Sequence, residues 1–167
     1  ESPFRPTADT IIIPVEIPFA DTVFIAPSPY IFHDFDPGPG VDIYQEITFN
    51  EGLQLFRASV QWDEPFASVC EGCPGAQSDL DVFVALQEDT GTIIYEASSY
   101  FNNIDGDAVE VPIYQFLSDS SSNTIQLLIG KYVEDPNQPD PNIVKYISFD
   151  DGNWEYDTNS PTVVGHS

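Results

Sequence analysis

Residues 53–62 read LQLFRASVQW, and this stretch decides the fold class. Four apolar residues in it alternate with other residues: Phe56, Ala58, Val60 and Trp62. This two-residue period is typical of a β-strand with one buried face. Because the four residues share a face, we expect a register change near Phe56. No segment of the chain has the period of a convincing amphipathic helix.

Further runs of β-branched and aromatic residues occur along the chain, bounded by Gly, Pro, Asn and Asp. We expect strands at 41–49, 80–86, 92–96, 109–113, 124–133 and 143–149, and a short strand near Trp154. Short strands at this spacing are typical of two packed antiparallel sheets. The sequence therefore predicts an all-β fold, an antiparallel β-sandwich or jelly roll over residues 31–167.

Residues 1–30 differ from the rest of the chain. The stretch from Thr10 to Ile25 is apolar, and the segment contains the prolines Pro14, Pro18, Pro27 and Pro29. Proline is excluded from central strands but is allowed at a sheet edge. We therefore predict an extended N-terminal arm or edge strand. Such a segment either covers its own sandwich or pairs with a neighbouring subunit by strand exchange, which would make a homo-oligomer.

Positive charge is nearly absent. Four Lys and Arg residues stand against 28 Asp and Glu residues, a formal net charge of −24. Such a chain repels itself unless salt or bound cations screen the carboxylates. Nucleic acid and anionic lipid are poor partners, because no cationic surface is available. Apolar residues still make up 41% of the chain, enough for a core, and no apolar run is long enough to span a membrane.

The two cysteines, Cys70 and Cys73, form a C-x-x-C motif among Gly and Pro residues. Such a motif is compatible with a redox site, half a zinc site, free thiols or a loop-closing disulfide. Zinc would need further soft ligands, for which the chain offers only His33 and His166. We expect the disulfide, which favours an extracellular, secreted protein.

Asp79 and Asp81 flank Leu80 and are the best candidates for a chemical site. On a strand the two carboxylates share a face about 7 Å apart, while Leu80 points into the core. Like charges at this distance repel unless a cation or hydrogen-bond donors lie between them. We predict a calcium site that also uses Asp63 and Asp107, with Asp105 as a weaker candidate. In the alternative, Asp79 accepts backbone N–H bonds and Asp81 is solvated.

Catalysis has little support from the sequence. His33, in His33-Asp34-Phe35-Asp36, could hold a metal or act as a base, but such a group is more often a surface turn. There is no G-x-S-x-G motif for a serine nucleophile. Trp62 and Trp154 could form a sugar-binding platform, although filling the core is the commoner role of Trp.

Four stretches follow one another along the chain: Val60–Phe66 (VQWDEPF), Gly75–Val84 (GAQSDLDVFV), Asn102–Val111 (NNIDGDAVEV) and Asp157–Ser167 (DTNSPTVVGHS). Their order resembles a β-sandwich domain found within or beside the catalytic domain of secreted bacterial subtilisin-like serine proteases. It is similar to the pre-peptidase C-terminal jelly rolls. The Asp-Leu-Asp strand is the most distinctive element, and the resemblance covers about residues 31–167.

This resemblance implies an accessory domain that is not an enzyme. The H-G-T and G-T-S motifs of the proteases are absent, and no catalytic role carries over. Domains of this kind are linked to calcium binding, stability and substrate attachment, and the partner would be a protease domain in a longer precursor. One alternative is a structural subunit of an extracellular filament or surface array, and another is a carbohydrate- or protein-binding module.

Overall fold

Strand β5 (Gly52–Trp62) is the centre of the first of two sheets in the computed structural model. The structure describes residues 2–19, 22–87, 93–99, 101–118, 123–133 and 137–156. In that part of the chain the first sheet has the order β1–β11–β5–β8, and β9 also pairs with β5. The other strands of this sheet are β1 (Ser2–Pro3), β8 (Val109–Glu110), β9 (Ile113–Ser118) and β11 (Ile143–Ser148).

Strand β10 (Thr124–Tyr132) is the centre of the second sheet. One of its edges pairs with β6, and the other pairs first with β4 and then with the end of β3. Strand β7 extends the sheet beyond β6, and β2 extends it beyond β3. The bounds are β2 (Ile11–Phe19), β3 (Thr22–Phe32), β4 (Gln45–Thr48), β6 (Leu80–Gln87), β7 (Ile93–Ser99) and β12 (Asn153–Trp154).

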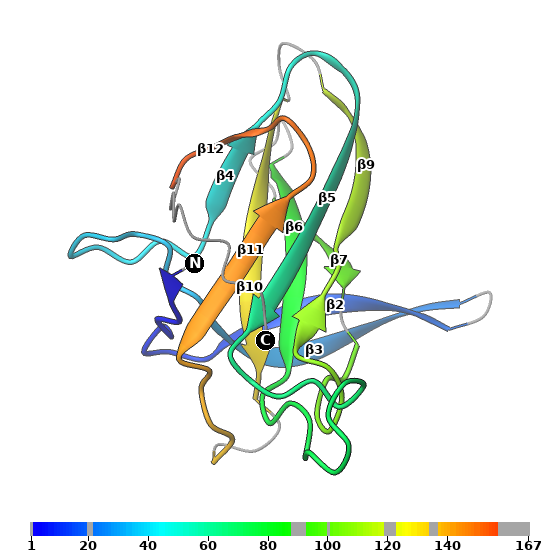
Figure 1. Ribbon diagram of the computed structural model, residues 1–167. Helices are drawn as coiled ribbons and strands as arrows, with labels where there is room; N and C mark the ends of the chain where they lie inside the picture. The colour runs from blue at the N-terminus through cyan, green and yellow to red at the C-terminus, as the bar shows by residue number, and fades with distance from the viewer. Residues whose placement is uncertain are drawn as a thin grey trace.

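The two sheets lie face to face, with β5 and β11 in front of β10 and β6 in Figure 1. Every pairing between these strands is antiparallel. The described residues contain no helix, and so none that could cross a membrane. The predicted all-β sandwich is confirmed.

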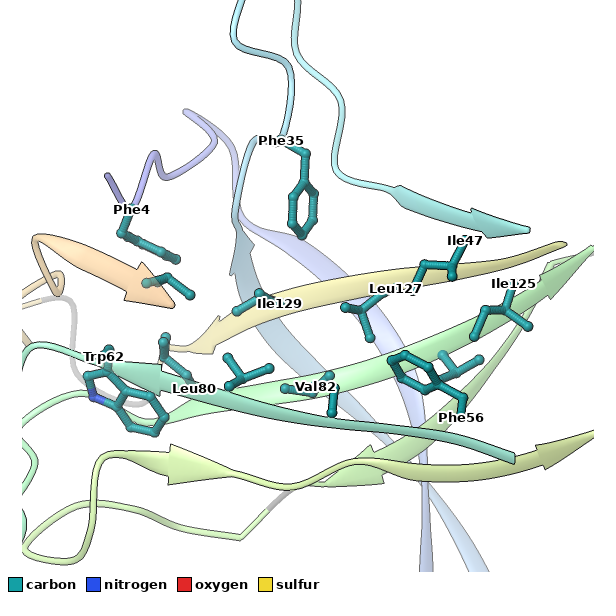
Figure 2. Close-up of a cluster of buried hydrophobic side chains, with 14 of the residues drawn as sticks. Phe4, Phe35, Ile47, Phe56, Trp62, Leu80, Val82, Ile125, Leu127 and Ile129 are labelled. Carbon is teal, nitrogen blue, oxygen red and sulfur yellow. The ribbon is translucent and has the colours of Figure 1, made fainter. Parts of the chain in front are cut away.

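The main core fills the space between the sheets, as Figure 2 shows. Phe56, Val60 and Trp62 project from β5, and all three are buried. They meet inward-facing residues of the second sheet: Leu80 and Val82 of β6, and Ile125, Leu127 and Ile129 of β10. Each such side chain contributes about 1.5–3 kcal/mol when it leaves water, so this layer is the main source of stability.

The predicted register change near Phe56 does not occur. Strand β5 alternates without interruption, and its ladders with β9 and β11 show no bulge. Leu53 and Leu55 therefore continue the outward parity of Arg57, and both are exposed. The direction of these two leucines is set by the pairing of β5 with its neighbouring strands and not by their apolar character.

The predicted strand at 109–113 is two strands. Pro112 separates β8 from β9, and the two pair with different parts of β5. Because Pro112 has no N–H to donate, the ladder is interrupted there, although its carbonyl still accepts a hydrogen bond from Ala58 N at 3.2 Å. Most of β9 lies beyond the predicted strand, which ends at Ile113.

The N-terminal segment is a hairpin rather than a single extended arm. Strand β2 pairs with β3 from Ile11 opposite Tyr30 to Phe19 opposite Thr22. In Figure 1 this hairpin runs across the direction of the other strands and projects beyond β7. The predicted extended conformation is therefore correct, but the segment's hydrogen-bonding partner is its own chain.

Proline positions decide which edges of this hairpin can pair further. Pro14 lies opposite Pro27, and because neither has an N–H, the ladder bonds must run through the neighbouring residues. Pro18 is an even number of residues from Pro14 on β2, and Pro29 is an even number from Pro27 on β3. A backbone N–H at any of these four positions would therefore point away from the hairpin partner. The outer edges thus lack an N–H donor at these four positions, a feature that hinders sheet edges from adding further strands.

A second, smaller core lies where the base of the hairpin packs on the outer face of the second sheet. It contains Ile13, Tyr30 and Phe32 of the hairpin with Phe83, Ala85 and Leu128 of β6 and β10. Tyr30 meets Phe83 edge to face, with ring centroids 5.0 Å apart. The described side chains of β6 are therefore covered on both faces of the sheet. Asp81 lies on this strand and is buried as well.

Candidate functional site

The loops that precede β6 and β8 meet at one end of the sandwich. Asp105 N donates to the carbonyl oxygen of Ala76, and Ala76 N donates to that of Gly106, both at 2.9 Å. An isolated parallel bridge joins Ala76 to Ile104. Two of the stretches that carry the resemblance, 75–84 and 102–111, are therefore in contact. The fourth stretch, 157–167, lies outside the described residues.

Gly75 makes this contact possible. Its φ of +73° is in the left-handed region, and a Cβ there would lie 2.5 Å from the carbonyl carbon of Asp105. Asp105 itself has a φ of +62°, a conformation that Asp tolerates better than most residues. The weaker calcium candidate is thus part of a tight turn.

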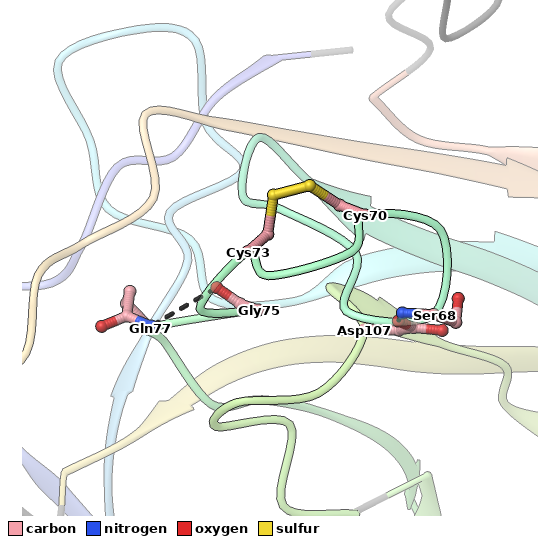
Figure 3. The surroundings of a disulfide bond; sticks show 6 residues. All are labelled: Ser68, Cys70, Cys73, Gly75, Gln77 and Asp107. Carbon is pink, nitrogen blue, oxygen red and sulfur yellow. Dashed lines mark hydrogen bonds between the residues drawn. A yellow bond between two sulfur atoms is a disulfide. The ribbon is translucent and has the colours of Figure 1, made fainter.

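Cys70 and Cys73 form a disulfide in the first of these loops, with Cα atoms 5.4 Å apart (Figure 3). The separation fits the predicted loop-closing bond. Near it, Ser68 N donates to Asp107 Oδ1 at 2.8 Å, which lowers the pKa of Asp107. The Asp107 carboxylate therefore joins the disulfide loop to the loop before β8.

Glu64, which was not predicted as a site residue, fixes the start of the same loop. Its Oε2 accepts hydrogen bonds from Trp62 Nε1 at 3.0 Å, Gln77 N at 2.8 Å and Ser78 N at 2.9 Å. Its Oε1 accepts one from Ser78 Oγ at 2.6 Å. A carboxylate with four donors is electrostatically satisfied without a cation.

Asp63 has a similar role. It accepts hydrogen bonds from the backbone N–H groups of Asn142 and Ile143 at 2.8 and 3.0 Å, and from Asn142 Nδ2 at 2.9 Å. Burial opposes ionisation, but these donors outweigh it and lower the pKa of Asp63. Asp63 therefore anchors the start of β11 to the end of β5.

Among the residues whose burial the structure describes, three acidic ones are buried: Asp79, Asp81 and Glu110, here called the buried carboxyl cluster. Asp79 Oδ1 accepts a hydrogen bond from Asn103 N at 2.9 Å, and Asp81 Oδ2 accepts one from the Tyr30 hydroxyl at 2.5 Å. Glu110 accepts a hydrogen bond from Ser99 Oγ. The cluster thus connects β6, the end of β7, β8 and the N-terminal hairpin.

Burial favours the protonated forms of two members of the cluster. Burial, with a smaller effect of Asp79, raises the pKa of Asp81 to about 7 against the Tyr30 hydrogen bond, which lowers it. Burial also raises the pKa of Glu110 to about 8, although Asn103 donates a hydrogen bond to this carboxyl; Asp81 and Asp79 add to the rise. Both carboxyls therefore keep a proton at pH values where exposed Asp and Glu are ionised.

Two oxygen atoms at the cluster have no hydrogen-bond partner: Asp81 Oδ1 and Asn103 Oδ1. Both are buried, and a buried oxygen without a donor is costly. The described residues nevertheless contain no group of three or more His, Cys, Asp or Glu side chains arranged to hold a metal ion. Of the predicted ligands, Asp79 and Asp81 interact with each other, whereas Asp63 and Asp107 organise other loop contacts.

Glu110 was not predicted as a site residue, because alternation in the sequence gives the wrong direction. Val109 and Val111 flank it, so a simple pattern would turn the valines inward and Glu110 outward. In the structure Glu110 lies opposite the core residue Val60 and is buried, whereas Val111 is exposed. The pairing with β5 decides this, and the local sequence carries no signal for it.

His33 is buried rather than part of a surface turn. Its Nδ1 accepts a hydrogen bond from Arg5 N at 3.2 Å, so the neutral ring carries its proton on Nε2, 3.4 Å from Ser2 Oγ. Burial, with a smaller effect of Arg5, lowers the pKa of His33 to about 4. A general base must present a free lone pair to the nucleophile, and here Nε2 presents a proton to Ser2. His166, the other histidine, lies outside the described residues.

The two tryptophans do not form a common surface. Trp62 is buried in the main core. Trp154 is half-buried and stacks on Tyr146, with ring centroids 5.3 Å apart. Both pack against the main core, as the simpler interpretation of the sequence predicts.

Comparison of the chain with protein families, with well-characterised proteins and with solved structures gave no significant match.

Gly75→Ala should destabilise the protein by about 2–4 kcal/mol, because it combines an unfavourable φ with a clash against the backbone of Asp105. Gly72→Ala is the matched control, since Gly72 has a φ of +83° but nothing within 4 Å of its added Cβ. The control should lose only about 1 kcal/mol. Urea unfolding of both variants measures the difference, and equal losses would show that the contact between the loops contributes nothing.

Asp81 and Glu110 should make stability fall as the pH rises from about 4 to about 8, whereas the buried neutral His33, whose pKa is lowered to about 4, opposes this fall below about pH 6.5. An acid whose pKa is raised by folding binds more protons in the folded state, so the unfolded state is favoured as the pH passes through this window. Asp81→Asn should reduce the pH dependence of the free energy of unfolding. Relative to the parent protein, the variant should be more stable at pH 8 than at pH 4 by about 1–4 kcal/mol. Asp63→Asn should leave the slope unchanged, since Asp63, with a lowered pKa, stays ionised throughout. Urea titrations across this pH range measure the free energy of unfolding. If it changes with pH equally in Asp81→Asn and in the parent protein, Asp81 is not buried in its neutral form.

Proposed function

We propose that the chain is a non-catalytic, secreted β-sandwich domain, an accessory module linked to a subtilisin-like protease domain in a longer precursor. The observation that carries the proposal is the use of carboxylates at the loop end of the sandwich. Glu64, Asp63 and Asp107 each accept hydrogen bonds from loop residues, so they organise structure rather than face a substrate. The confirmed sandwich and the contact between stretches 75–84 and 102–111 also fit the resemblance.

The state of His33 supports a non-catalytic role. The Ser2 hydroxyl faces a protonated nitrogen, and the ring nitrogen with the lone pair is occupied by Arg5 N. Phe4 and Phe35 enclose the ring, with centroids 5.5 and 4.7 Å from that of His33. The disulfide between Cys70 and Cys73 supports secretion, since such bonds persist in oxidising compartments.

Labelling with a fluorophosphonate probe tests the non-catalytic role. The protein should react no faster than Ser2→Ala, and neither should hydrolyse casein or nitrophenyl esters, because no base activates the Ser2 hydroxyl. A purified serine protease provides the positive control. Labelling that is lost in both Ser2→Ala and His33→Gln would contradict the proposal. Sequencing the gene on both sides of this segment tests the linkage, which predicts the catalytic motifs of a protease in the same reading frame.

We further propose that calcium stabilises the domain at the buried carboxyl cluster. Oxygen atoms of Asp79, Asp81 and Asn103 are of the kind that calcium prefers, and the unpartnered Asp81 Oδ1 and Asn103 Oδ1 favour a cation there. Bound calcium would also hold Asp81 and Glu110 in their ionised forms, which burial alone opposes. Asp63 and Asp107 have less support as ligands, because loop donors occupy them.

Calorimetric melting with calcium and with chelator tests this site. Calcium at about one hundred times its Kd adds about 2.7 kcal/mol, a rise in Tm of about 5–10 °C. The rise should vanish in Asp79→Asn and persist in Asp63→Asn, the matched control. A calcium response that survives Asp79→Asn, or no response in the parent protein, would contradict the proposal.

Strand exchange through the N-terminal segment, the filament alternative, has less support. The segment pairs with itself as a hairpin, and its four prolines remove N–H donors from the outer edges. The third alternative, a carbohydrate-binding module, loses its predicted platform because Trp62 is buried.

A further inference from the structure

The outer face of the first sheet is unusually apolar. Six large side chains that project from it, or directly follow its strands, are exposed: Leu53, Leu55, Ile113, Leu117, Ile147 and Phe149. We call this set the exposed apolar face. Leu53 and Leu117 are the most open of them on the strands, with 70% and 68% of their surface in water. Exposed apolar patches larger than about a few hundred Å² on a soluble protein often mark interaction sites.

The register of the strands places these residues on one face of the sheet. Leu53 lies directly opposite Leu117, and Ile113 lies opposite Arg57, next to Leu55 on the same face. On the other side of β5, Ile147 lies opposite Ser59. Side chains opposite one another on a sheet face are about 4.5–5.5 Å apart at Cβ, so Leu53 and Leu117 are within contact distance, and the other apolar residues lie on the same face of the sheet.

Charge is distributed unequally between this face and the rest of the molecule. The outward-facing residues of β5, β9 and β11 include Arg57 and Lys145, two of the four basic residues of the chain. None of these strand positions is occupied by Asp or Glu, although the chain has 28 of them. The nearby carboxylate of Asp150 is paired with Arg57 at 3.1 Å. The face therefore lacks the negative charge that covers the chain elsewhere.

We propose that two copies of the chain associate through the exposed apolar face, one sheet against the other. Two molecules that each carry a net charge of −24 repel unless their contact surface is free of carboxylates, and this face meets that condition. A two-fold axis brings a surface against itself, which suits a face that is apolar and self-complementary. Arg57 and Asp150 of one copy can then also meet Asp150 and Arg57 of the other.

The size of the face suits a weak dimer. The six side chains and the aliphatic stems of Arg57 and Lys145 offer on the order of several hundred Å² per copy, which is less than the roughly 800 Å² per partner that a standard interface buries. Packed sheet faces lie about 10 Å apart, a distance that interdigitating Leu and Ile side chains fill. Burial of this area is the driving force, and repulsion between the remaining carboxylates limits it.

Sedimentation equilibrium of the purified chain at low and at high salt tests the proposal. We expect a dimer whose dissociation constant falls as salt rises, because screening reduces the repulsion between the two acidic copies. A contact dominated by opposite charges, as with an acidic partner of another kind, would instead weaken with salt.

Two variants locate the contact. Leu53→Glu and Leu117→Glu each place a carboxylate at the most exposed pair of the face, where Leu53 and Leu117 lie opposite each other, and each should raise the dissociation constant at least about tenfold. Val69→Glu is the matched control, since Val69 is equally apolar, 82% exposed and located in the disulfide loop. It should leave the dimer unchanged. Unfolding in urea confirms that the three variants keep the parent's stability, as expected for exposed positions.

Two results would overturn the proposal. The first is a monomer at every concentration reached in both low and high salt. The second is a dimer that survives Leu53→Glu and Leu117→Glu but is lost in Ile12→Glu, since Ile12 is an exposed residue of the hairpin. The second result would move the contact to the N-terminal segment.

Discussion

Alternation along β5 is the constraint on which the rest of the structure depends. The even-numbered residues of this strand, among them Phe56, Val60 and Trp62, face the core. The odd-numbered residues, among them Leu53 and Leu55, face the solvent. Since β5 pairs with β11 on one edge and with β8 and β9 on the other, its register also decides the direction of residues on those strands. Glu110 enters the fold for this reason, and the apolar face outside is a consequence of the same alternation.

The fold accommodates many acidic residues through donors of its own chain. Glu64, Asp63 and Asp107 accept N–H and O–H bonds at the loop end, and Arg57 pairs with Asp150 at the edge of the sheet. Such donors satisfy individual carboxylates but leave the net charge of −24 unchanged, so repulsion over the whole molecule remains for salt or cations to screen. The buried carboxyl cluster is different, because there the protonated form relieves the repulsion.

Most of the strands could be predicted, because their apolar alternation is strong and Gly, Pro, Asn and Asp interrupt it. The burial of Phe56, Ala58, Val60 and Trp62 was predicted correctly, as was the direction of Leu80 into the core. The candidate site was predicted only in part. Asp79 and Asp81 stand out in the sequence, but their partners Tyr30, Asn103 and Glu110 come from three other segments. Contacts between segments distant in the chain leave no local pattern.

The amino-acid sequence alone determined that this protein is an all-β sandwich and that it is strongly acidic, and it favoured a disulfide between the two cysteines over the alternatives. These properties follow from residue type and near-neighbour spacing. The tertiary structure decided that the N-terminal segment pairs with itself, that Glu110 is buried and that Leu53 and Leu55 are not. The physical reason is strand register: a shift of one residue reverses every side chain, and register is set by partners far away in the chain.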